Sequence, residues 1–191
     1  MATSDIRLIP HFLTSVESDF YFSELLRSIP WRQKEIMIFG KLVLEPRLTA
    51  WVGDPDAVYA YSGVRMPPLP WTKTLLEIKT RVEDKAGQKF NSVLANLYRD
   101  HRDSMGLHSD DEKELGKNPV IASVSLGAKR KFIMKHRTLK TALQRKYLLE
   151  TGSLLIMRGD TQKLWKHGIP KESQPCGARI NLTFRTIFNP S

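Results

Sequence analysis

Apolar and polar residues alternate along several short segments in the second half of the chain. A two-residue period is typical of a strand that buries one face, and it predicts strands at residues 92–98, 121–126 and 131–134. Residues 154–157 form a continuous apolar run, as in a strand that is buried on both faces. Many short strands separated by turn residues predict a mainly β fold, either a sandwich or a jelly roll. The pattern alone does not distinguish these two architectures.

Two helices are predicted before these strands, where the hydrophobic period becomes helical. The first begins with a capping box in residues 14–17 and ends before Pro30. Its predicted apolar face consists of Val16, Phe20, Leu25, Leu26 and Ile29. The second begins near Pro70 and ends near Gly87. Its predicted apolar face consists of Trp71, Leu75, Ile78 and Val82. We expect both faces to pack against the core.

Residues 35–44 are predicted to form a β-hairpin between the two helices. Gly40 separates two apolar runs and has the backbone freedom that a tight turn requires, which places Phe39 at or near the tip. Phe39 either joins the core, as most phenylalanines do, or acts as a wedge between nucleic-acid bases. Tyr59 and Tyr61 share one face of a short segment, and they belong either to the core or to the walls of a pocket for a flipped base.

The composition describes one globular domain. The chain has 191 residues, of which 41% are hydrophobic and 26% charged, and this excludes general disorder and membrane insertion. The first residues lack the basic start and apolar run of a signal peptide. Cys176 is the single cysteine and cannot form an internal disulfide. We therefore expect a protein of a reducing intracellular compartment, cytoplasmic in a prokaryote or nuclear in a eukaryote.

The net charge of +10 is unevenly distributed. Residues 115–149 contain no aspartate or glutamate. Their basic residues are Lys117, Lys129, Arg130, Lys131, Lys135, Arg137, Lys140, Arg145 and Lys146. Such a segment is either a solvated basic face or a surface for a polyanion, of which nucleic acid is the commonest. We favour the nucleic-acid interpretation because the segment follows a candidate active-site motif.

His108 and Asp110 are candidate metal ligands, because side chains two residues apart point the same way on an extended backbone. With one distant histidine they would form the facial triad that holds Fe(II) and leaves coordination positions open. His167 is our candidate for that histidine, and His101, close to the motif, is its main competitor. By itself, an H-x-D motif in an acidic loop is more often a solvated surface turn.

Residues 179–185 alternate strictly between polar and apolar side chains. The apolar face consists of Ile180, Leu182 and Phe184, and the polar face consists of Arg179, Asn181, Thr183 and Arg185. The apolar face belongs against the core. The polar face lies either in solvent or along a cavity, where the two guanidiniums would bind a dicarboxylate bidentately.

These motifs, taken in order, resemble the AlkB family of Fe(II)- and 2-oxoglutarate-dependent dioxygenases that dealkylate nucleic acids. The resemblance extends from about residue 36 to 188 and rests on H-S-D-D-E at 108–112, the later His167 and R-I-N-L-T-F-R at 179–185. N-L-Y at 96–98 and residues 119–127 belong to the same pattern. The chain is most similar to the small DNA-repair branch with an aromatic-tipped hairpin. It departs from the family at His101, where a small residue is usual.

The resemblance implies a double-stranded β-helix, or jelly roll, with flanking helices. It implies one dioxygenase domain over residues 1–191, with an N-terminal extension to about residue 90 that carries nucleotide-recognition hairpins and a catalytic core over about 91–191. The cofactors implied are Fe(II), 2-oxoglutarate and O2. The implied iron ligands are His108, Asp110 and His167. The implied 2-oxoglutarate ligands are Asn96, Tyr98, Arg179, Asn181, Thr183 and Arg185. The implied substrate-binding residues are Phe39, Gly40, Lys41, Tyr59, Ala60, Tyr61, Asp111 and Glu112.

The resemblance also implies a reaction, the oxidative dealkylation of bases such as N1-methyladenine and N3-methylcytosine in DNA, with release of succinate, carbon dioxide and an aldehyde. Asp111 is expected to face the base, and Phe39 to fill the gap that a flipped base leaves. The partner is expected to be alkylated DNA or RNA, and the protein a monomer without membrane attachment. Two alternatives are open: the same chemistry on RNA or protein, and a basic nucleic-acid-binding module without catalysis.

Overall fold

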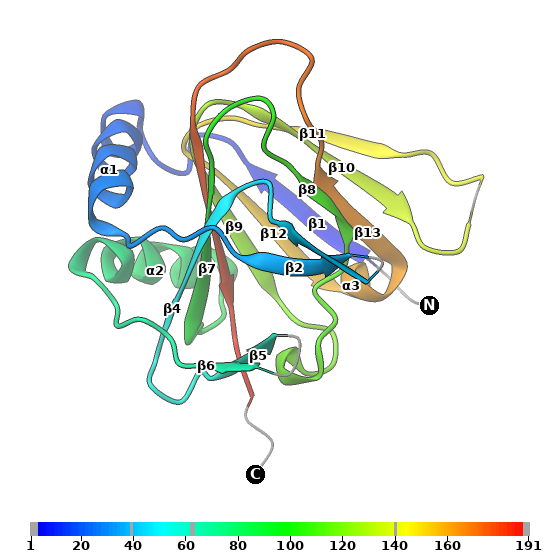
Figure 1. Cartoon of the computed structure of the whole chain (residues 1–191), viewed down its shortest axis with the longest axis horizontal. Helices are drawn as coiled ribbons and strands as arrows, with labels where there is room; N and C mark the ends of the chain where they lie inside the picture. The colour runs from blue at the N-terminus through cyan, green and yellow to red at the C-terminus, as the bar shows by residue number, and fades with distance from the viewer. Residues whose placement is uncertain (1–3, 39, 62–63, 140, 189–191) are drawn as a thin grey trace.

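Two antiparallel sheets form the body of the protein in the computed structural model, which describes residues 4–38, 40–61, 64–139 and 141–188 (Figure 1). For Ile38 and for residues 59–61 and 64–66, the backbone alone is described. The large sheet has the spatial order β1 (Ser4–Ile9), β12 (Ser153–Gly159), β9 (Ile121–Gly127), β14 (Arg179–Arg185), β7 (Ser92–Tyr98) and β4 (Leu48–Gly53). The small sheet has the order β11 (Arg145–Leu149), β10 (Arg130–His136), β13 (Trp165–Ile169) and β8 (Met105–His108).

The sheets face each other as the two halves of a jelly roll, which confirms the predicted fold class. The predicted segments 92–98 and 179–185 coincide with β7 and β14, and the other predicted strands lie within β9, β10 and β12. Strands β1 and β4 precede residue 90 and are hydrogen-bonded members of the large sheet.

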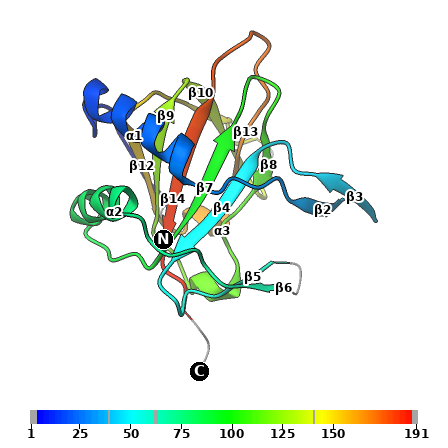
Figure 2. The same cartoon turned by 60° about the vertical axis from the view of Figure 1, so that its left-hand side comes forward.

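Helices α1 (Ser15–Ser28) and α2 (Lys73–Ala86) cover the outer face of the large sheet (Figure 2). The capping box that starts α1 is present at Thr14 and Glu17. The predicted apolar face of α1 is wrong in part, because Val16 and Phe20 are 78% and 60% exposed and Leu26 is also exposed. Leu25 and Ile29 are buried as predicted, and the helix also buries Ser18 and Tyr21.

Helix α2 follows its prediction more closely. It begins after Thr72, whose side chain accepts a hydrogen bond from the Leu75 amide, so its first residue, Lys73, lies three residues beyond the predicted start at Pro70. Its buried residues include Leu75, Ile78 and Val82. Gly87 ends it in the left-handed conformation, with φ of 59°, which glycine adopts without a steric penalty. None of the helices in the described residues is long and apolar enough to cross a membrane.

Two hairpins stand outside the sheets: β2 (Glu35–Ile38) with β3 (Lys41–Leu44), and β5 (Tyr59–Tyr61) with β6 (Val64–Met66). The first is the hairpin predicted at 35–44, with Gly40 in its turn at φ of 76°. It projects from the body of the protein (Figure 2). Met37, Leu42 and Leu44 are exposed on it, which is unusual for large apolar side chains and is typical of a surface that meets a partner. Phe39 lies outside the described residues.

The core has two parts, one on each face of the large sheet. The apolar face of β14, with Ile180, Leu182 and Phe184, packs in the part beneath the helices. Between the sheets lies a second cluster that includes Ile121, Phe132 and Met134. Because the strands of the large sheet are covered on both sides, the polar face of β14 must also be inside the protein.

Candidate active site

The three predicted metal ligands meet at one end of the space between the sheets. His108 ends β8 and is directly paired with His167 on β13, and Asp110 follows two residues after β8. Each of the three offers a ligand atom, and these atoms all lie within 4.8 Å of one another. Asp110 Oδ2 is 3.5 Å from His167 Nε2, and Asp110 Oδ1 is 4.0 Å from His108 Nε2. Two imidazoles and one carboxylate on one side of a site are the ligands of a facial iron triad.

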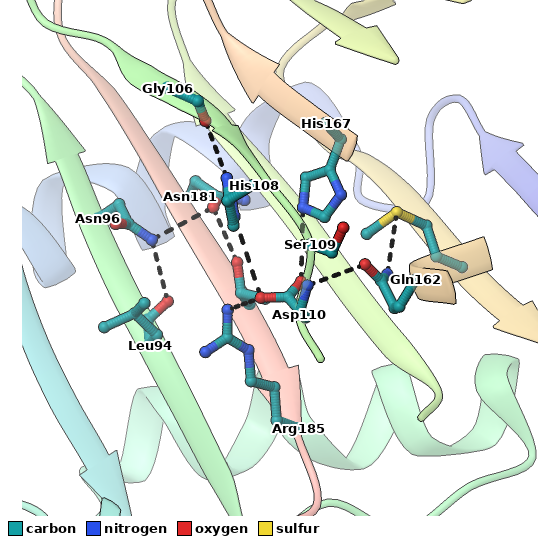
Figure 3. Close-up of polar contacts among 12 residues, drawn as sticks. Leu94, Asn96, Gly106, His108, Ser109, Asp110, Gln162, His167, Asn181 and Arg185 are labelled. Carbon is teal, nitrogen blue, oxygen red and sulfur yellow. Dashed lines mark hydrogen bonds and ion pairs between the residues drawn. The ribbon is translucent and has the colours of Figure 1, made fainter. Parts of the chain in front are cut away.

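Hydrogen bonds, drawn in Figure 3, and a ring contact hold these ligands in place. His108 Nδ1 lies 2.9 Å from the carbonyl oxygen of Gly106. Since that oxygen can only accept, Nδ1 carries the hydrogen and Nε2 keeps its lone pair for a metal. The Asp110 amide donates to Gln162 Oε1 at 3.0 Å, and the Phe132 ring stacks on His167 with centroids 5.3 Å apart.

The electrostatics of the site favour the charge states that a cation requires. Burial lowers the pKa of His108 to about 4, with His167 adding to the effect, so His108 is neutral at pH 7. Burial opposes ionisation of Asp110, but the Arg185 guanidinium and His167 hold its pKa well below the usual range. A neutral imidazole and an ionised carboxylate are the forms that bind a metal.

A cavity of about 380 Å³ opens beside the triad and runs between the sheets to the base of the β2–β3 hairpin. All six predicted 2-oxoglutarate ligands line it: Asn96, Tyr98, Arg179, Asn181, Thr183 and Arg185. The alternative in which the polar face of β14 lies in solvent is therefore wrong. Arg185 donates to Asp110, which connects the two-arginine strand to the metal ligands.

Arg179 provides a test of whether an anionic cofactor fits. Its side chain is buried, and Nη2 donates to Ser125 Oγ at 2.9 Å, while Nε and Nη1 have no hydrogen-bond partner among the described residues. Burial lowers its pKa to about 10, and the neighbouring Arg130 adds to the effect. A buried guanidinium with two unused donor atoms would be stabilised by an anion, and a carboxylate matches its planar geometry. The residues present therefore fit 2-oxoglutarate.

Asp111 and Glu112 occupy different places. Glu112 lines the cavity together with the triad. Asp111 is outside that lining and is half exposed, and its carboxylate pairs with Arg137 at 2.6 Å. The structure thus places Glu112, and not Asp111, where it can face a base beside the metal. Lys41 and Gly40 lie at the exposed end of the hairpin, and the side chains of residues 59–61 are not described, so the roles predicted for these residues stay predictions.

Arg130 is an exception within the basic segment of residues 115–149, which was predicted to be a surface. It is completely buried, and its guanidinium donates to the main-chain oxygens of Asp100, Asp103 and Pro170. It also lies over the Tyr98 ring, 5.4 Å from the centroid. Alternation could have identified it, because β10 places Arg130 on the buried face of the strand. A guanidinium in this position holds the loops that flank β8 and β13, and it cannot bind phosphate.

Two further cavity residues, Glu45 and Arg47, carried no predicted role. Both are buried, and Arg47 Nε donates to Asn96 Oδ1 at 2.9 Å. The sequence around Pro46 contains no periodic signal for either residue. The competitor His101 does not belong to the metal group: among the described residues, the triad is formed by the predicted set.

The fold and this site define an oxygenase that depends on Fe(II) and 2-oxoglutarate. The family model described as "2OG-Fe(II) oxygenase superfamily" matches residues 5–185, and the chain belongs to this family. It is an enzyme of the AlkB group, with Fe(II), 2-oxoglutarate and O2 as its cofactors. The non-catalytic alternative is therefore wrong.

Its similarity to particular proteins is high over most of the chain. It is 43% identical over 193 residues to the bovine "Alpha-ketoglutarate-dependent dioxygenase alkB homolog 3", covering 97% of this chain and 67% of that protein. It is 38% identical over 181 residues to the mouse "DNA oxidative demethylase ALKBH2", covering 90% and 76%. Among solved structures, OsALKBH1 matches with a TM-score of 0.62 at 19% identity, over 95% of this chain and 97% of that one, which is a likeness of fold.

Proposed function

We propose that this protein oxidatively removes alkyl groups from bases in DNA, with N1-methyladenine and N3-methylcytosine as the type of lesion. The observation that carries the proposal is the shared cavity, which is lined by the triad, by the two-arginine face of β14 and by residues at the base of a projecting hairpin. The name of the mouse relative, a DNA oxidative demethylase, supports DNA as the substrate. We further propose a monomer that acts inside the cell.

In this proposal each wall of the cavity has a task. His108, Asp110 and His167 hold Fe(II), and Arg179, Arg185 and their polar neighbours bind the carboxylates of 2-oxoglutarate. The bound iron, with 2-oxoglutarate and O2, supplies oxidation of the alkyl carbon and gives succinate, carbon dioxide and an aldehyde. The protein positions that carbon near the metal and shields the site from water.

The base itself must leave the helix to reach this cavity. Flipping costs a few kcal/mol and costs least where pairing is already damaged, as it is when the pairing edge carries an alkyl group. We propose that Tyr59 and Tyr61 stack against the flipped base. Glu112, on the iron side of the cavity, accepts a hydrogen bond from the exocyclic amino group.

A panel of alkylated oligonucleotides tests the proposal. Incubation of N1-methyladenine or N3-methylcytosine substrates with the enzyme, Fe(II), 2-oxoglutarate and O2 is expected to give the unmodified base and one succinate for each base repaired. Mass spectrometry of the product base and of succinate measures both. If only alkylated RNA were repaired, the substrate would be RNA and not DNA. If no alkylated base were repaired, the proposal would be overturned.

Replacing Phe39 with alanine is expected to reduce repair of duplex DNA about tenfold more than repair of single strands, since a stacked aromatic contributes roughly 1–3 kcal/mol per base. The reason is that a wedge at the hairpin tip fills a gap that exists only in a duplex. The measurement is kcat/KM on the same lesion in both forms. Phe20→Ala, which removes an exposed phenylalanine from α1, is the matched control. An equal loss on both forms would remove the wedge role.

A further inference from the structure

Glu45 is a buried acid on the cavity wall to which the proposed reaction assigns no role. It follows β3 at the base of the projecting hairpin and is 4% exposed. It lines the same cavity as the iron triad and Glu112. Glutamate is almost never buried to this degree without a specific set of partners.

The partners of Glu45 hold it firmly but leave one oxygen unused. Arg47 Nη2 donates to Oε1 at 3.0 Å. The main chain is fixed on both sides, since the Glu45 amide donates to the Lys34 oxygen at 2.8 Å and Gln33 Nε2 donates to the Glu45 oxygen at 2.7 Å. Oε2 is buried and accepts no hydrogen bond from the described residues. A buried acceptor without a donor is costly, so a ligand with an N–H group in the cavity would be stabilised there.

Arg47 connects this acid to the cofactor-binding side of the cavity. The same guanidinium that holds Glu45 donates through Nε to Asn96 Oδ1 at 2.9 Å. Asn181 Oδ1 accepts hydrogen bonds from Thr183 Oγ1 at 3.0 Å and from Asn96 Nδ2 at 3.5 Å. Glu45 therefore stands on a rigid polar framework, and a base bound between the hairpin and the metal would meet a carboxylate oxygen of defined position.

We propose that Glu45 is a specificity-determining residue that accepts a hydrogen bond from one N–H of the amino group of the flipped base, while Glu112 accepts from the other. This inference rests on the proposed function. An ionised carboxylate can only accept. Adenine N6 and cytosine N4 are amino groups at the position where guanine and thymine carry the carbonyl oxygens O6 and O4. Glu45 thus favours alkylated adenine and cytosine. It disfavours alkylated thymine and guanine, because their carbonyl oxygen and the Glu45 carboxylate are both acceptors and repel each other.

Glu45→Gln tests this because it keeps the shape and replaces one acceptor with a donor. The glutamine oxygen can still accept from Arg47, while its amino group occupies the place of Oε2. The substrates are N3-methylcytosine and N3-methylthymine at the same position of the same oligonucleotide, and the readout is the ratio of their kcat/KM values. The wild-type ratio is expected to favour N3-methylcytosine, and Glu45→Gln is expected to lower it about tenfold or more, as hydrogen bonds to charged groups allow.

The control is Glu77→Gln, the same chemical change at an exposed position of α2 outside the cavity lining, which is expected to leave the ratio unchanged. An unchanged ratio in Glu45→Gln, or an equal loss on both substrates, would overturn the inference while the proposed function stands. A wild-type enzyme that repairs both lesions equally would overturn it without any variant. A wild-type enzyme that repairs neither would instead contradict the proposed function on which it rests.

Discussion

Replacing Asp110 with asparagine is expected to abolish iron binding and turnover together. The amide keeps the shape of the side chain but lacks the negative charge between the two imidazoles and Arg185. Loss of even an outer partner of a metal ligand lowers affinity about 10–100-fold, so loss of the anionic ligand itself is expected to cost at least about a hundredfold. Titration of Fe(II) or Mn(II) under anaerobic conditions measures binding, and succinate formation measures turnover.

The control for this variant is Asp84→Asn, which removes a carboxylate from the exposed side of α2. It is expected to bind metal and turn over as the wild type does. Thermal unfolding of both variants separates loss of the metal site from loss of the fold. An Asp110→Asn protein that is folded and still binds iron with wild-type affinity would contradict the assignment of the triad.

Replacing Arg179 with glutamine is expected to raise the KM for 2-oxoglutarate about a hundredfold or more. Two donor atoms of this buried guanidinium have no partner among the described residues, and each hydrogen bond to a charged group contributes roughly 1.5–3 kcal/mol. Because Arg179 does not contact the metal ligands, kcat at saturating 2-oxoglutarate should change much less than KM. Thr183→Val, which removes a neutral partner, should raise KM only about tenfold or less.

Arg179 is a sharper test of cofactor binding than Arg185, because Arg185 also donates to Asp110 and its loss would disturb both sites. Arg27→Gln is the matched control, since Arg27 is an exposed arginine on α1. An unchanged KM for 2-oxoglutarate in the Arg179 variant would show that another group binds the cofactor. A fall in the metal affinity of the Arg179 variant, with an unchanged KM for 2-oxoglutarate, would contradict the assignment of Arg179 to the cofactor site and not to the metal site.

Local periodicity identified the features that depend only on residues close together in the chain. The alternation of β14 predicted an apolar face and a polar face, and both are as expected because a strand places successive side chains on opposite sides. The capping box of α1 was also predicted correctly, because it depends on only four consecutive residues. The same helix shows the limit: several side chains could form its apolar stripe, and packing on the sheet selected the side of Tyr21 and Leu25.

The sequence by itself determined the strands, the order of the motifs and which side chains share a face, because these follow from the fixed geometry of the backbone. Tertiary structure decided what each face meets. It turned Asp111 towards Arg137 and Glu112 towards the cavity, although they are adjacent in the chain. It also placed Glu45 on the cavity wall. Such outcomes depend on segments remote in sequence that pack together, and no local pattern encodes the identity of a remote neighbour.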